Sequence, residues 1–132
     1  MLFSLMAGWP AAAAAQDDAP VDCANAVAQV ELTYCAEQDY LAEDKALNAA
    51  YKDVVTRAKS IDDDLGAAQG GALAALKKAQ RAWIDYRDGQ CDLAGYQAVG
   101  GTAQPMIIYG CLATQTKKRT EELRDLLADF DR

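Results

Sequence analysis

The chain has 132 residues with 13 Lys and Arg against 20 Asp and Glu, a net charge of −7, and no histidine. This length suits one compact domain. The acidic balance argues against nucleic-acid and anionic-membrane partners, because both need clustered Lys and Arg, and it favours basic protein partners. The lack of histidine excludes His-dependent acid–base and nucleophilic catalysis, and it excludes zinc sites built on imidazole.

The first fifteen residues, MLFSLMAGWPAAAAA, are uncharged and end in an alanine-rich run before polar Gln16. Ala13 and Ala15 form an A-x-A motif, which predicts an export signal over residues 1–15 with cleavage after Ala15. A basic n-region is missing, and an alanine-rich disordered arm is the alternative. The apolar run falls short of the ~20 residues that span a bilayer, so no membrane anchor is predicted. Residues 16–22 then form a flexible lead-in, and residues 23–132 form a single domain.

The domain is predicted to be all-α, because apolar residues recur at three- and four-residue steps and no strand pattern occurs. We expect a short helix between Ala26 and Cys35 and a long helix over about residues 37–60. The stretch 60–66 and the following glycines are expected to break the chain. Short connections between such helices favour a small antiparallel bundle of three long helices plus the short N-terminal helix.

A second long helix is expected from Leu73 to near Cys91, where Gly95 and Gly100-Gly101 stop it. A third follows Pro105, because proline is tolerated in the first turn of a helix.

Four cysteines in an exported chain predict two disulfides. If Gly100-Gly101 is the turn of a helical hairpin, Cys91 and Cys111 lie at similar heights on neighbouring helices and can pair. Cys23 and Cys35 are then left to each other. A continuous helix would hold these two ~18 Å apart, beyond the ~7 Å limit for a bridge, so Cys23 must lie in an extended segment folded back along the helix. The alternatives are a metal site or a redox pair, but neither spacing is C-x-x-C.

Polar residues also occupy faces that are predicted to be buried. A buried charge is tolerated only when it is paired, so we expect Asp44 to pair with Arg87 or Arg119 on a neighbouring helix. Trp83 can shield such a network from water. A carboxylate–arginine active site is the functional alternative; a network that sets helix register is favoured, because no nucleophile or second free carboxylate joins it. The predicted network comprises Asp44, Gln80, Arg87, Gln115 and Arg119.

No metal or cofactor site is predicted. The run Asp62-Asp63-Asp64 lacks the alternating ligand spacing of a calcium loop, and Gly66, Gly70 and Gly71 are not followed by the Gly-Lys-Ser/Thr of a phosphate loop.

Two motifs in the chain are specific together: a C-x₁₁-C segment that leads into D-x-x-L-N-x-x-Y, and A-Q-x-x-W-x-x-x-R-D-x-x-C. With them, the chain resembles the lysozyme inhibitor LprI-like family over about residues 22–127. The resemblance implies a small, helical, disulfide-linked exported domain. It also implies that the motif residues are core and disulfide positions. The chain departs from the family pattern at Ala28, where many relatives have a Thr that caps the first helix. The motif positions expected in the core are Leu47, Asn48, Tyr51, Trp83 and Leu123.

Together with the net charge of −7, the export signal and the lack of catalytic residue types, the resemblance favours a periplasmic or secreted binding protein without catalytic activity that inhibits a lysozyme-like muramidase. An acidic domain would be steered towards a basic lysozyme, with Asp62, Asp63 and Asp64 as candidate contacts. A structural or adaptor protein of the cell envelope is the alternative, which an exposed apolar patch would favour. An enzyme that uses Asp44 and Arg87 is a third hypothesis, and it requires both residues in an open cleft.

Overall fold

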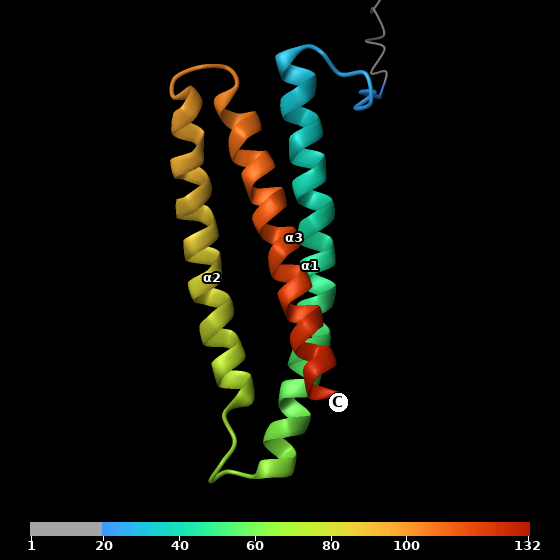
Figure 1. The fold of residues 1–132 in the computed structure, drawn as a ribbon, viewed down its shortest axis with the longest axis vertical. Coiled ribbons are helices and arrows are strands. Elements are labelled where there is room, and N and C mark those ends of the chain that lie inside the picture. The colour runs from blue at the N-terminus through green and yellow to red at the C-terminus, as the bar shows by residue number, and fades with distance from the viewer. Residues whose placement is uncertain (1–19) are drawn as a thin grey trace, which may run out of the picture.

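The computed structural model describes residues 20–132, so the predicted export signal and its cleavage after Ala15 lie outside the described residues. Within residues 20–132 the chain forms α1 (Gln29–Leu65), α2 (Ala72–Gly95), the single-turn 3₁₀ helix η1 (Tyr96–Ala98) and α3 (Gln104–Phe130), with no strand. Helix α2 runs antiparallel to α1 and α3, and α3 packs most extensively along α1 (Figure 1). The predicted all-α bundle is confirmed.

The first helix is longer than the sequence pattern predicts. A separate short helix before Cys35 is wrong, because α1 continues without a break from Gln29 to Leu65. The physical reason is that this stretch contains neither glycine nor proline, so nothing interrupts its hydrogen-bond ladder. Ala28 has no capping side chain, and the carboxylate of Glu31 instead accepts hydrogen bonds from the backbone N–H groups of Val27 and Ala28, at 3.3 Å each.

The connection between α1 and α2 is shorter than expected, because residues 60–65 are helical. Gly66 ends α1 with φ of 73°, a left-handed conformation that favours glycine. The carboxylate of Asp62 then accepts backbone N–H groups of Gly71 and Ala72, both at 2.7 Å, and of Leu73 at 3.1 Å. These donors lower the pKa of Asp62 below its ordinary value, with Gly71 the largest cause. A residue at the end of α1 therefore caps the start of α2.

At the other end of the bundle, both predicted stops are confirmed: α2 ends at Gly95, and the chain turns at Gly100, which has φ of 75°. Gly95 is the last residue of α2 and is buried. A Cβ at this position would lie 2.8 Å from Cγ1 of Ile108 on α3. The glycine is thus required because the two helices approach too closely for a side chain.

Both predicted disulfides are confirmed. Cys91 on α2 pairs with Cys111 on α3 at a Cα–Cα distance of 5.4 Å, and Cys23 pairs with Cys35 on α1 at 5.7 Å. Cys23 lies in the non-helical segment before α1, which agrees with the predicted segment that folds back along the helix. Both bridges lie at the end of the bundle where α1 begins and α2 ends.

The buried apolar residues gather at the opposite end, towards the α1–α2 connection. This part, residues 45–87 and 117–132, is called the core end below. Partly buried apolar residues, Tyr51 and Trp83 among them, pack against this core. The buried cluster consists of Leu47, Ala50, Val54 and Ala58 on α1, Leu76 on α2 and Leu123 on α3.

Candidate functional site

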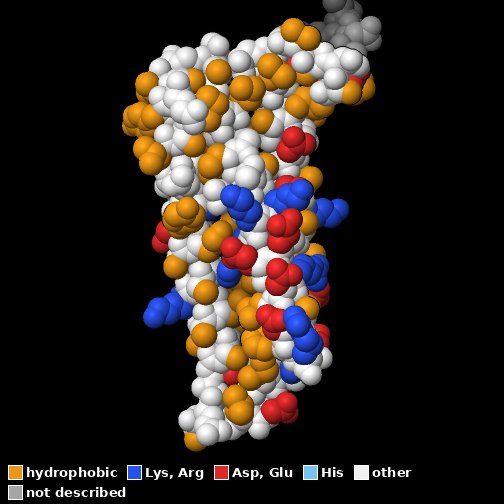
Figure 2. Space-filling view, viewed as in Figure 1, with side chains coloured by type: hydrophobic (Ala, Val, Ile, Leu, Met, Phe, Trp, Pro, Cys, Tyr) orange, Lys and Arg blue, Asp and Glu red, His pale blue; other side chains and the backbone are white. Residues whose placement is uncertain are grey.

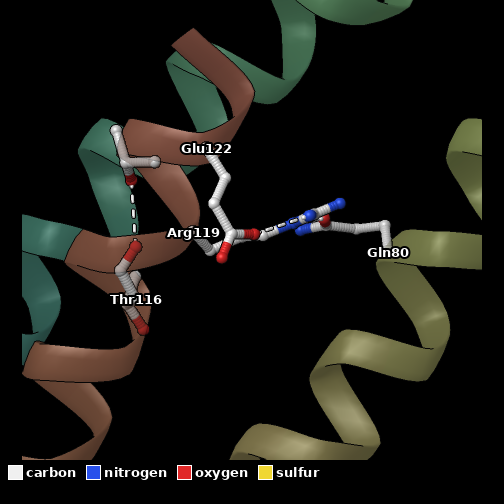
Figure 3. Close-up of polar contacts among 5 residues, drawn as sticks. Gln80, Thr116, Arg119 and Glu122 are labelled. Atoms are coloured by element: carbon white, nitrogen blue, oxygen red, sulfur yellow. Dashed lines mark hydrogen bonds and ion pairs between the residues drawn. The ribbon is translucent and has the colours of Figure 1, made fainter. Parts of the chain in front are cut away.

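Part of the predicted polar network is present between α2 and α3. Arg119 donates from Nε to Oε1 of buried Gln80 at 3.0 Å, and its Nη1 pairs with Oε2 of Glu122 at 3.0 Å (Figure 3). Sequence reasoning missed Glu122 as the carboxylate of this cluster. Its position three residues after Arg119 on the same helix is the signal that identifies it.

Arg87 lies in a separate cluster and is only 8% exposed. Its guanidinium carbon lies 5.0 Å from the ring centre of Trp83 and 5.6 Å from that of Tyr40, and Nε pairs with Oδ1 of Asp88 at 2.9 Å. Two aromatic faces and one carboxylate therefore hold a cation that is largely removed from water.

The predicted pairing of Asp44 with Arg87 or Arg119 is wrong. Asp44 is half-buried, and its Oδ2 accepts a hydrogen bond of 3.4 Å from the side-chain amide of Asn48 on the same helix. Each arginine instead uses a carboxylate close to it in sequence, which costs less ordering than a partner on another helix. Half-buried Gln115 makes no hydrogen bond to Gln80 or Arg119 within residues 20–132. The structure thus does not bring together the carboxylate and arginine that the enzyme hypothesis requires.

The expected core positions of the family motif differ in their burial. Leu47 and Leu123 are buried, and Tyr51 and Trp83 are partly buried against the core. Asn48 is exposed, so its assignment to the core is wrong. Its side chain has a polar partner in Asp44 and gains nothing from leaving water.

The charges of the molecule are segregated along the bundle. Residues 20–44 and 88–116, called the acidic end below, contain eight Asp and Glu and no Lys or Arg. All 13 Lys and Arg of the chain lie in the core end, together with ten Asp and Glu. On the face drawn in Figure 2, the blue side chains lie among red ones in the middle and lower parts, and none lies near the upper end. The acidic end therefore carries an excess of negative charge, although Asp88 at its boundary pairs with Arg87.

Large apolar side chains are also exposed at the acidic end. Val27 and Val30 near the start of α1 are 85% and 76% exposed, and Leu93, Tyr96 and Val99 around the α2–α3 turn are all more than 60% exposed. An apolar surface combined with one sign of charge is typical of a protein-binding surface.

A groove at the acidic end runs between α1 and the start of α3. Its volume is about 540 Å³, and α1 contributes residues at positions i, i+3, i+4 and i+7, which form one helix face. It contains a single charged group, the carboxylate of Glu37. The residues that line it are Gln29, Val30, Thr33, Tyr34 and Glu37 on α1, Thr102 just before α3, and Pro105 in the first turn of α3.

No group of carboxylate and cysteine side chains that could hold a metal ion occurs within residues 20–132. In the same part of the chain, none of the helices combines the length and the hydrophobicity that a membrane span needs.

The described residues thus form a small three-helix, disulfide-linked domain. Residues 22–123 match the sequence profile of the family described as Lysozyme inhibitor LprI, and the chain belongs to this family.

The chain is similar to proteins from several bacteria. Uncharacterized protein R02472 of Rhizobium meliloti (strain 1021) is 54% identical, over 94% of this chain and 91% of that protein. Uncharacterized protein YecT of Escherichia coli (strain K12) is 30% identical, over 68% of this chain and 59% of that protein. A crystal structure of a DUF1311 family protein from Pseudomonas putida KT2440 has the same fold, with a TM-score of 0.63 and 23% identity, over 74% of this chain and 92% of that one.

Proposed function

We propose that this chain is an exported binding protein that inhibits a basic lysozyme-type muramidase without catalysing a reaction itself. The observation that carries the proposal is the acidic end, with eight carboxylates, no Lys or Arg, and exposed apolar side chains beside them. Such a surface attracts a basic enzyme at long range and offers apolar area for close contact. The family, named for a lysozyme inhibitor, supports the choice of partner.

The acidic end replaces Asp62, Asp63 and Asp64 as the proposed contact region. These three residues lie in the last turn of α1, at the end of the bundle that also holds every Lys and Arg. Asp62 is moreover engaged by three backbone donors of α2. A basic partner would meet nearby positive charge there, which opposes its approach.

Export to the periplasm or the exterior is part of the proposal. The two disulfides support it, because such bonds persist in oxidising compartments. Intact-mass measurement of the exported protein tests it, and the expected first residue is Gln16.

Inhibition is tested by the rate at which a basic lysozyme lyses cell walls in the presence of the purified, oxidised protein. We expect slower lysis at low salt and a weaker effect as salt rises, because salt screens the attraction.

Two double variants remove two charges each from exposed positions at opposite ends: Asp39→Asn/Asp92→Asn at the acidic end and Asp63→Asn/Asp64→Asn at the core end. The first should weaken inhibition and the second should leave it unchanged. Full lysozyme activity with excess wild-type protein at low salt would refute the proposal.

The second candidate is a cell-envelope adaptor that binds another protein. The exposed apolar residues at the acidic end favour it, because they suit an apolar partner as well. The salt series separates the two functions: binding driven by apolar contact persists at high salt, whereas recognition of a basic enzyme weakens.

A further inference from the structure

The groove at the acidic end has the shape and chemistry to receive one long cationic side chain. Val30 and Pro105 supply apolar wall, Tyr34 supplies an aromatic ring that is 44% exposed, and Glu37 supplies the charged group. Arg and Lys bury an aliphatic stem along apolar surface and keep the cation at the tip, so their requirements match this groove. A neutral side chain would leave the negative charge of Glu37 without an opposite charge.

Glu37 is available for such a partner. Its Oε1 accepts a hydrogen bond of 3.4 Å from the hydroxyl of Tyr109, and the acidic end contains no Lys or Arg to neutralise it. The Tyr109 ring in turn packs against Tyr40, with ring centres 6.4 Å apart, so aromatic contacts support the wall behind the carboxylate. The charge is thus positioned by neighbours that leave it uncompensated.

Other grooves in the described part of the bundle lack this combination. Lys77 and Arg81 line one between α1 and α2, and Arg119 lines an apolar one at the core end, so a cationic side chain would be repelled from both. A second groove between α1 and α3 and a hollow at the α1–α2 connection contain carboxylates, but no aromatic ring lines either of them.

The surroundings of Arg87 are an example, within this protein, of an arginine held by aromatic rings and a carboxylate. Arg87 lies against the rings of Tyr40 and Trp83 and pairs with Asp88. The groove provides an aromatic ring and a carboxylate without the arginine.

We propose that the groove between α1 and α3 binds an arginine side chain of the partner protein as the anchor of the complex. Arginine is preferred over lysine because its planar guanidinium both stacks on tyrosine and binds a carboxylate through two donors. This inference rests on the proposed function for the identity of the partner, a basic lysozyme, but the groove can be examined separately.

The first experiment compares two single variants on the same helix, Glu37→Gln and Asp39→Asn, each of which removes one negative charge. Glu37→Gln keeps an acceptor for the Tyr109 hydroxyl, so the fold should be retained, and circular dichroism checks it. Binding of a basic lysozyme is followed by surface plasmon resonance. Glu37→Gln should raise the dissociation rate about tenfold, because an anchored charge pair is lost, whereas Asp39→Asn should change only the association rate, by about twofold or less. Tyr34→Ala should also raise the dissociation rate. Equal effects of Glu37→Gln and Asp39→Asn, confined to association, would overturn the anchor.

The second experiment needs no enzyme. N-acetyl-argininamide is titrated into the oxidised protein while the Tyr34 ring signals are followed by nuclear magnetic resonance, with the uncharged citrulline analogue as control. We expect weak saturable binding of the arginine compound, lost in Glu37→Gln and kept in Asp39→Asn.

If the arginine compound binds but the protein leaves lysozyme fully active, the proposed function fails and the groove stands. If the protein inhibits lysozyme but neither Glu37→Gln nor Tyr34→Ala changes dissociation, the groove assignment fails and the function stands.

Discussion

The two ends of this bundle are stabilised in different ways. The core end contains the whole cluster of buried apolar side chains, and all Lys and Arg surround it. At the acidic end the buried residues are Cys91, Gly95 and Thr116; the Cys91–Cys111 disulfide links α2 to α3 there, and Cys23–Cys35 fixes the segment before α1 to that helix. One end thus depends on apolar burial and the other on covalent links.

This difference has a consequence for the surface. Large apolar side chains at the acidic end, such as Val30, Leu93 and Tyr96, are exposed to solvent and do not contribute to a buried core. A disulfide keeps helices together without removing apolar area from water, so it leaves that area for a partner. The end with fewer buried apolar residues is therefore the end that carries the proposed binding surface.

The largest expected effect comes from removing the buried disulfide. Cys91→Ala/Cys111→Ala should lower the free energy of unfolding by about 3 kcal/mol, because a bridge across twenty residues restricts the unfolded chain by about that amount. Cys23→Ala/Cys35→Ala should have a smaller effect, since it frees a segment whose residues are mostly exposed. Chemical denaturation of both variants measures the difference. Equal losses would show that the bridge between α2 and α3 stabilises the fold no more than the Cys23–Cys35 bridge does.

Two glycines on α2 sharpen the comparison, because they predict changes of opposite sign. Gly95→Ala places a Cβ 2.8 Å from Cγ1 of Ile108 and should cost about 1–3 kcal/mol of stability. Gly89→Ala meets nothing within 4 Å and should raise stability by about 0.4–1 kcal/mol, because alanine restricts the unfolded chain. Thermal unfolding of the two variants measures this. A stabilising Gly95→Ala would mean that α2 and α3 can separate at no cost.

Thr116 lies at the boundary between the two ends. It is fully buried, and its hydroxyl has no hydrogen-bond partner within residues 20–132, while its carbonyl accepts from the Thr120 hydroxyl at 3.1 Å (Figure 3). Thr116→Val keeps the shape and removes the unpaired group, so it should raise stability by about 1 kcal/mol. Thr120→Val removes a formed hydrogen bond and should give no gain. Calorimetry of both variants distinguishes these outcomes.

The smallest effect is expected at the core end, where Asp62 caps α2. Asp62→Ala should lower the melting temperature slightly, and Asp63→Ala and Asp64→Ala should not, because only Asp62 accepts the backbone donors. The pKa of Asp62 is lowered in the folded protein, so its stabilisation is complete above the ordinary aspartate pKa and is lost as the pH falls through the lowered value. The difference between wild type and Asp62→Ala should therefore shrink in acid. A constant difference across that pH range would argue against the cap.

The sequence by itself determined the helical class, the turn at Gly100 and both cysteine pairings, because these follow from local periodicity, glycine chemistry and short chain distances. It also contained the charge segregation, since Lys and Arg are missing from two long stretches. That the two stretches lie at one end became evident only once the helices were arranged.

Tertiary structure decided which polar groups meet. Arg87, Arg119 and Asp44 all lie on faces that periodicity predicts to be buried, yet the arginines take Asp88 and Glu122 as partners. Periodicity places a residue on a face but does not give the distance between two helices, and an ion pair depends on that distance to within an ångström or so. The close approach at Gly95 and the capping of α2 by Asp62 depend on helix placement in the same way.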